Sequence, residues 1–247
     1  MRTSNPTLNS KTFSQFASYS RENSMTINGT VNKTSILLVL TIISAAYTWG
    51  MFLNSFNPGA VLPWMILGAI GGFIVAIITA FKPIWSPITA PLYALLEGLF
   101  LGGISAQFEA RFPGIAMQAV GLTFGILFAL LFAYKSRLIK VTENFKLGVV
   151  AATGGIALLY FVSFFLSFFG MSIPFIHQSG PIGIIFSLGV VVIASLNLVL
   201  DFDFIEKGAE SGAPKYMEWY AAFGLLVTLV WLYLEILRLL AKLRSRD

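Results

Sequence analysis

The chain has 247 residues, of which 57% are apolar and only 11% are charged, and its mean hydropathy is +0.82. Soluble domains have about 45–50% apolar and about 25% charged residues, so this composition excludes a soluble globular protein and indicates a membrane protein. The chain lacks cysteine and has a single histidine. These counts argue against disulfides, thiolate metal sites and redox or metallohydrolase chemistry, so we expect no enzyme and no cofactor.

Residues 1–33 are rich in Ser, Thr and Asn and contain no continuous apolar run of signal-peptide length. They are expected to form a polar, disordered cytoplasmic tail. The remainder, 34–247, is expected to form one transmembrane domain.

Seven apolar runs of about 20 residues follow, separated by short polar breaks rich in Pro and Gly. A helix of that length crosses the ~30 Å hydrocarbon core, and only helices satisfy their backbone groups within one segment. We therefore expect an all-α membrane protein with seven spans at about 35–54, 61–81, 88–106, 115–134, 148–169, 181–201 and 219–241.

The net charge of +5 reflects the basic loops that orient membrane proteins, and we expect no nucleic-acid partner. Placing the N-terminus in the cytoplasm puts most Lys and Arg residues on the inner side. The exceptions are Arg111 in an outer loop and a basic group at the C-terminus, namely Arg238, Lys242, Arg244 and Arg246. An odd number of spans puts this group outside, so either its side chains snorkel or the last segment does not fully cross.

Three glycine pairs have the four-residue spacing that lets helix backbones approach closely: Gly68/Gly72, Gly98/Gly102 and Gly121/Gly125. We expect this spacing to serve dense packing within the bundle, with a dimer interface as the alternative.

Two glutamates lie within apolar spans, several turns from the nearest break. These residues are Glu97 in the third span and Glu235 in the seventh. A charged carboxylate at bilayer depth costs about 2.5–3.5 kcal/mol even on the lenient insertion scale. Both side chains should therefore face the bundle interior, where they are protonated, paired or hydrated; a neutral Glu in an interhelical hydrogen bond is the structural alternative.

The end of the sixth span is also polar, because Asn197 and Asp201 share one helix face while Asp203 lies about 200° round from Asp201. Only one of the two aspartates can easily face inward. The candidate counter-ions are Lys82, at the inner end of the second span, and Arg238, one turn beyond Glu235. The alternatives are that Lys82 anchors lipid headgroups and that Arg238 snorkels to the surface.

Two established membrane functions do not fit these residues. A retinal protein needs a lysine in the middle of its last span, and none occurs between Lys215 and Lys242. An intramembrane serine protease needs a membrane-embedded histidine beside its serine, whereas the single His177 falls in a loop.

The segment from Trp231 to Leu240, the segment from Asn197 to Glu206, the Glu97-Gly98 pair and the seven-span layout resemble the Bax inhibitor-1 family, particularly its bacterial branch. The resemblance implies six helices around a central seventh. It also implies a calcium leak controlled by a pair of carboxyl groups, here Asp201 and Glu235, although Glu235 stands where relatives have Asp. Lys82 most nearly matches an arginine that latches the sixth-helix aspartate in some relatives.

The predicted function is a pH-responsive Ca²⁺ leak in the bacterial inner membrane. Asp201 and Glu235 would be the proton sensor and transient Ca²⁺ ligands, with Glu97, Asn197 and Asp203 as further polar lining. The expected partners are the lipid bilayer and Ca²⁺ or protons. The alternative is a regulatory protein that modulates a membrane-bound protease without transport, in which the tail would matter more than the carboxylates.

Overall fold

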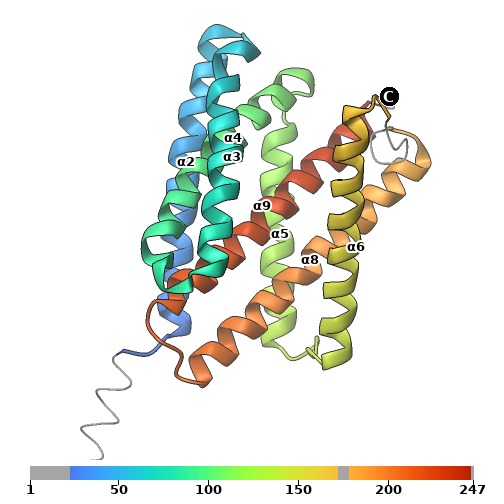
Figure 1. Cartoon of the computed structure of the whole chain (residues 1–247). Helices are drawn as coiled ribbons and strands as arrows, with labels where there is room; N and C mark the ends of the chain where they lie inside the picture. The colour runs from blue at the N-terminus through green and yellow to red at the C-terminus, as the bar shows by residue number, and fades with distance from the viewer. Residues whose placement is uncertain (1–22, 172–177, 246–247) are drawn as a thin grey trace, which may run out of the picture.

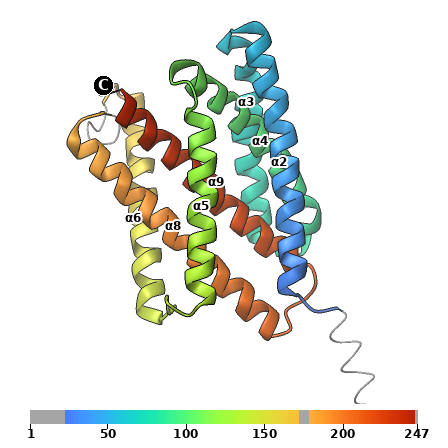
Figure 2. The same ribbon diagram turned by 180° about the vertical axis from the view of Figure 1, so that it is seen from behind.

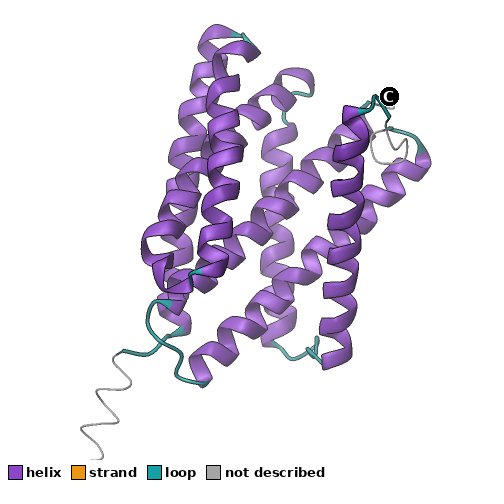
Figure 3. Cartoon of the chain, viewed as in Figure 1, coloured by secondary structure: helices purple, strands orange, loops and turns teal. Residues whose placement is uncertain are grey.

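A computed structural model describes residues 23–171 and 178–245, and seven long α-helices account for most of this part. The elements in chain order are α2 (Ile27–Ser55), α3 (Pro58–Phe81), η1 (Pro83–Trp85), α4 (Ser86–Arg111), α5 (Ile115–Lys135), α6 (Glu143–Phe168), α8 (Pro181–Glu210) and α9 (Met217–Arg244). Figure 3 shows that the described residues hold helices and loops with no strand. All seven α-helices are long and apolar enough to cross a membrane, which confirms the predicted all-α membrane fold.

The first helix begins at Ile27, earlier than the sequence pattern predicts, so 27–33 belong to α2 and not to the polar tail. Two contacts account for this start. The side chain of Thr26 caps the helix by accepting a hydrogen bond from the Gly29 N–H at 2.9 Å. The charged side chain of Lys33 forms an ion pair with Glu218 of α9. Residues 1–22 of the predicted tail lie outside the described residues.

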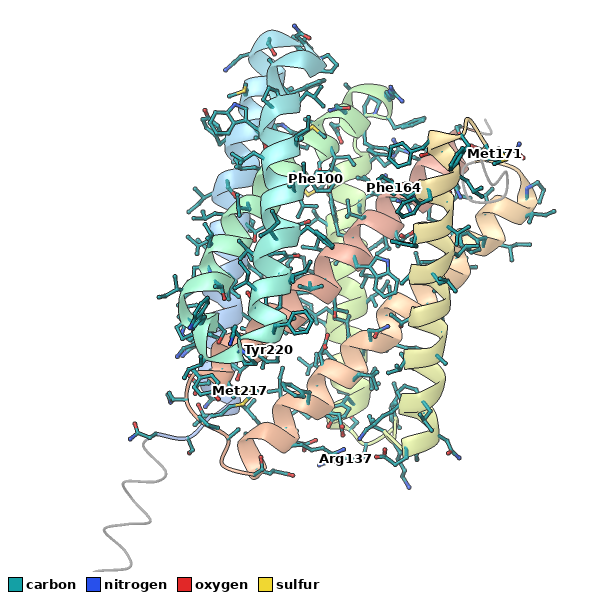
Figure 4. All side chains as sticks on the ribbon, viewed as in Figure 1. Phe100, Arg137, Phe164, Met171, Met217 and Tyr220 are labelled. Carbon is teal, nitrogen blue, oxygen red and sulfur yellow. The ribbon has the colours of Figure 1, made fainter. Side chains whose placement is uncertain are left out.

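The chain runs back and forth across the bundle, so the two ends of the described chain lie at opposite ends of the molecule (Figure 1). We call the end that holds the start of α2 the N-terminal face and the end that holds the last turn of α9 the C-terminal face. In Figure 4, Arg137 and Met217 lie at the N-terminal face and Met171 at the C-terminal face. Figures 1 and 2 show α8 and α9 running obliquely, whereas α2, α3, α5 and α6 stand more upright.

Helix α9 is the central element of the bundle. It packs against α2, α4, α5 and α8, while α3 packs mainly on α2 and α4. One side of α9 contributes Leu229 and Leu232 to a core shared with α5 and α8, and another side contributes Leu226 and Val230 to a core shared with α2 and α4. Helix α9 is less apolar than the peripheral α3 and carries Glu235 and Arg238, so its central position shelters polar groups that are costly to expose to lipid.

The outer faces of the helices expose large apolar side chains, as a bilayer requires. Phe73 of α3, Phe128 of α5 and Phe164 of α6 are each more than half exposed, and many other large apolar side chains are also exposed. Soluble proteins seldom leave such wide apolar surfaces uncovered, because water penalises them. The exposed faces are therefore the lipid-facing surface.

The glycine pairs separate into packed and open sets. A Cβ atom at Gly98 would lie 2.0 Å from Ser44 Oγ, and one at Gly102 would lie 2.0 Å from the Ala45 carbonyl oxygen, so α2 and α4 meet through these glycines. Gly68 is equally close to the backbone of α4. Gly121 and Gly125 face open space within the described part of the chain. The expected dense packing is confirmed at Gly68, Gly98 and Gly102 but not in α5.

Candidate functional site

Glu235 lies deep in α9 with 2% of its surface exposed, and two groups hold its carboxylate. Arg238, one turn further along the same helix, places Nη1 2.9 Å from Oε1 and 3.1 Å from Oε2. The hydroxyl of Tyr160 in α6 lies 3.1 and 3.2 Å from the same two oxygens. The buried carboxylate is therefore both ion-paired and hydrogen-bonded, as burial of a charge demands.

Tyr160 and Arg238 also contact each other. Arg238 Nη1 donates a hydrogen bond to the Tyr160 hydroxyl at 2.9 Å, and the guanidinium carbon lies 5.3 Å from the centre of the Tyr160 ring. The Arg238 side chain remains 42% exposed. The arginine thus connects the buried Glu235 to the surface.

Asp201 lies in α8 and presents a different environment. Its Oδ2 atom is shielded from solvent and has no hydrogen-bond partner among the residues that the structure describes. The residue facing its carboxyl group is Thr228 of α9, whose hydroxyl donates to the Gly224 carbonyl at 3.2 Å. A buried polar atom without a partner is costly, so this oxygen has unused capacity for a proton, a water molecule or a cation.

Asp201 and Glu235 lie beside the same face of α9. Thr228, which faces Asp201, is two helical turns before Glu235, a separation of about 10 Å along the helix. No hydrogen bond or ion pair joins the Asp201 and Glu235 side chains in the described part of the chain. The two carboxyl groups are therefore separated along the axis of α9, and a direct contact between them stays a prediction.

The other predicted lining residues lie apart from one another. Glu97 of α4 lies in the interface with α3, where a Cβ atom at Gly72 would be 3.1 Å from its Oε2. Asn197 ties α8 to α6, because its Nδ2 donates to Thr153 Oγ1 at 2.8 Å and to the Ile193 carbonyl at 2.9 Å. Asn197 therefore lies at the contact between α8 and α6, in the same helix as Asp201. Glu97 lies between a different pair of helices, α3 and α4.

Asp203 belongs to a charged cluster at the N-terminal face. Its carboxylate lies 2.7 Å from Lys207 Nζ and 3.4 Å from Lys146 Nζ. In the same region Glu206 pairs with Arg137 at 2.8 Å and accepts a hydrogen bond from Tyr134. These contacts make Asp203 a surface ion-pair residue in this structure.

The two candidate counter-ions, Arg238 and Lys82, lie in different environments. Arg238 Nη1 lies 2.9 Å from Glu235 Oε1, although the Arg238 side chain also reaches the surface. Lys82 is the exposed C-terminal cap of α3, and among the residues described it forms no ion pair within 4.0 Å of a carboxylate. The contact that would latch Asp201 to Lys82 is therefore not formed here.

Comparison with protein families agrees with this architecture. A model of the family described as Bax inhibitor 1 like matches residues 5–245. The chain belongs to the Bax inhibitor 1 like family. Comparisons with curated proteins and with solved structures gave no match.

This Bax inhibitor 1 like protein also contains a buried carboxylate that the sequence analysis did not single out. Glu218, at the start of α9, is fully buried and lies 2.8 Å from Lys33 Nζ and 3.0 Å from Lys215 Nζ. It also accepts hydrogen bonds from the backbone N–H and the hydroxyl of Thr26, at 3.0 and 2.8 Å. Only its spacing from Lys215 is visible in the sequence, because Thr26 and Lys33 are distant along the chain.

The basic group at the C-terminal face of this family member is bonded to the protein. Lys242 is 5% exposed and donates to the Gly183 carbonyl at 3.0 Å and to Ser187 Oγ at 2.8 Å. Arg244 donates to the Pro113 carbonyl at 2.7 Å and to Gln118 Oε1 at 2.9 Å. Helix α9 therefore spans the whole bundle, with these charges held by polar partners. Arg246 lies outside the described residues.

Proposed function

We propose that this protein is a pH-responsive cation leak, with Ca²⁺ as the permeant ion and Asp201 and Glu235 on its pathway. The observation that carries the proposal is the buried Oδ2 of Asp201, which has no hydrogen-bond partner in the described part of the chain and lies beside the α9 face that also bears Glu235. Intramembrane acids typically line ion or proton pathways, and carboxylate oxygens are the ligands that Ca²⁺ prefers.

In this proposal the present structure corresponds to a closed arrangement. The charge of Glu235 is already neutralised by Arg238, and Tyr160 occupies both of its oxygens. A cation can use Glu235 only after Arg238 moves away, and the 42% exposure of the arginine gives it a route toward the membrane surface. Arg238, not Lys82, is then the counter-charge that opposes conduction.

The pH response follows from the protonation of the two carboxyl groups. A deprotonated carboxylate attracts a cation, whereas a protonated one does not, so rising pH makes the pathway more attractive to Ca²⁺. Charged groups near Glu235 are Arg238 on its own helix and Lys242 one turn beyond, and the titratable Tyr160 faces it from α6.

We also propose a bacterial inner-membrane location with the N-terminal face in the cytoplasm. Exposed Lys135 and Lys140 lie at the end of α5 and in the following loop, on the N-terminal face, where positive residues favour a cytoplasmic side. At the opposite face, Lys242 and Arg244 are bonded to protein groups and contribute less to this bias.

Calcium efflux from vesicles tests this function. Purified protein reconstituted into vesicles with an internal Ca²⁺ indicator is expected to give efflux that increases several-fold between pH 6 and pH 8. A fluorescence time course at each pH measures it, with protein-free vesicles and an ionophore as lower and upper references. Efflux equal to that of protein-free vesicles at every pH would refute the leak, and efflux independent of pH would refute the carboxyl sensor.

A further inference from the structure

A cavity of about 250 Å³ opens at the C-terminal face, where the last turns of α4 and α9 meet. Helix α4 contributes Phe108, Arg111 and Phe112 to its wall, and α9 contributes Arg238 and Lys242. Phe108 and Arg111 lie one turn apart at the end of α4, and Phe112 is the residue that follows the helix as its C-cap. The cavity therefore has an apolar side and a basic side.

The basic side has an excess of positive charge. Arg111 is exposed, and no carboxylate lies within 4.0 Å of it in the described part of the chain. Arg238 uses Nη1 for Glu235 and Tyr160, and a guanidinium has further N–H donors. Lys242 adds a nearly buried positive charge whose Nζ is oriented by Gly183 and Ser187.

The acidic groups nearby do not cancel this charge. The carboxylate of Glu109 in α4 accepts hydrogen bonds from the backbone N–H groups of Gly114 and Ala116 at the start of α5. Glu235 balances one arginine only. Three basic residues thus line this cavity, and the described residues of its wall include no carboxylate.

We propose that this cavity binds the phosphate group of an anionic phospholipid from the leaflet at the C-terminal face. Guanidinium forks match the geometry of phosphate oxygens, and basic side chains at the ends of spans attract anionic headgroups. A free phosphate ion would use the same cations. The apolar wall formed by Phe108 and Phe112 favours the lipid, because it offers a surface for the glycerol and the first acyl carbons.

Lipid binding to the full-length protein tests the proposal. Delipidated protein in neutral detergent is titrated with phosphatidylglycerol, phosphatidylcholine or inorganic phosphate, and bound lipid is counted by native mass spectrometry. Phosphatidylglycerol is expected to bind most tightly, and Arg111→Gln is expected to weaken it about fivefold, as the loss of one interfacial basic contact predicts. Arg111→Lys should weaken it less, because the charge remains while the fork is lost.

Lys135→Gln is the matched control, because it removes one exposed positive charge at the N-terminal face. It should leave the affinity for phosphatidylglycerol unchanged, and melting curves of the lipid-free variants should coincide with that of the wild type. Equal losses in Arg111→Gln and Lys135→Gln would overturn the site. Equal binding of phosphatidylcholine would overturn the anionic preference, and competition by inorganic phosphate at equal concentration would overturn the lipid as its occupant.

Discussion

Replacing Arg238 with glutamine is expected to lower the free energy of unfolding by about 2–3 kcal/mol. The substitution leaves the carboxylate of Glu235, which is 2% exposed, without its positive partner. Breaking a fully buried ion pair costs about 3–5 kcal/mol, and we expect less here because Arg238 is partly exposed. Unfolding in mixed detergent micelles, followed by tryptophan fluorescence, measures the change.

The double variant Arg238→Gln/Glu235→Gln is the matched control for this effect. It removes the stranded charge but keeps a side chain that can accept a hydrogen bond from Tyr160. It should therefore recover about half of the lost stability, which is the signature of an energetic coupling between the two residues. A double variant no more stable than Arg238→Gln alone would show that the pair does not carry the effect.

Replacing Gly102 with alanine is expected to destabilise the bundle by about 3 kcal/mol. An added Cβ atom would lie 2.0 Å from the Ala45 carbonyl oxygen and 2.3 Å from Thr48 Oγ1. The first of these is a backbone atom, so relief requires α2 and α4 to separate. Overpacking of this kind costs about 1–3 kcal/mol, and a contact with backbone belongs at the upper end of that range.

Gly125→Ala is the control for that prediction, because it makes the same substitution in another membrane-spanning helix, α5. Apart from its chain neighbours and the backbone of its own helix, no described heavy atom lies within 4 Å of a Cβ atom at Gly125, so the substitution should be close to neutral or slightly stabilising. The same denaturation assay compares the two variants. Equal destabilisation by both would mean that the glycines act through backbone flexibility and not through close packing.

The sequence predicts the fold well, because hydrocarbon thickness dictates the length of each apolar run. All seven predicted spans match helices. The prediction is least accurate at the start of α2, where residues 27–33 are polar by composition yet helical. The start of α2 is held by Glu218, which accepts hydrogen bonds from Thr26 and forms an ion pair with Lys33. Local hydropathy carries no signal for contacts between residues so distant in the chain.

The candidate site is predictable only where its partners are close in sequence. The depth of Glu235 follows from its position in an apolar span, and the presence of Arg238 on the same face follows from their spacing along one helix. Tyr160 could not be predicted, because it comes from α6 and resembles any other aromatic residue of a span. The environment of Asp201 depends on how α8 crosses α9, which the register of a single helix does not determine.

The most direct test of the central claim is Ca²⁺ efflux from vesicles that contain the double variant Asp201→Asn/Glu235→Gln, measured across the same pH range as the wild type. Glu143→Gln, which neutralises a carboxylate that is 83% exposed at the N-terminal face, is the control. The account predicts that the double variant folds, as judged by circular dichroism, but that its efflux falls to the protein-free level and no longer responds to pH, while the control behaves as wild type. A folded double variant with unaltered, pH-dependent efflux would contradict it.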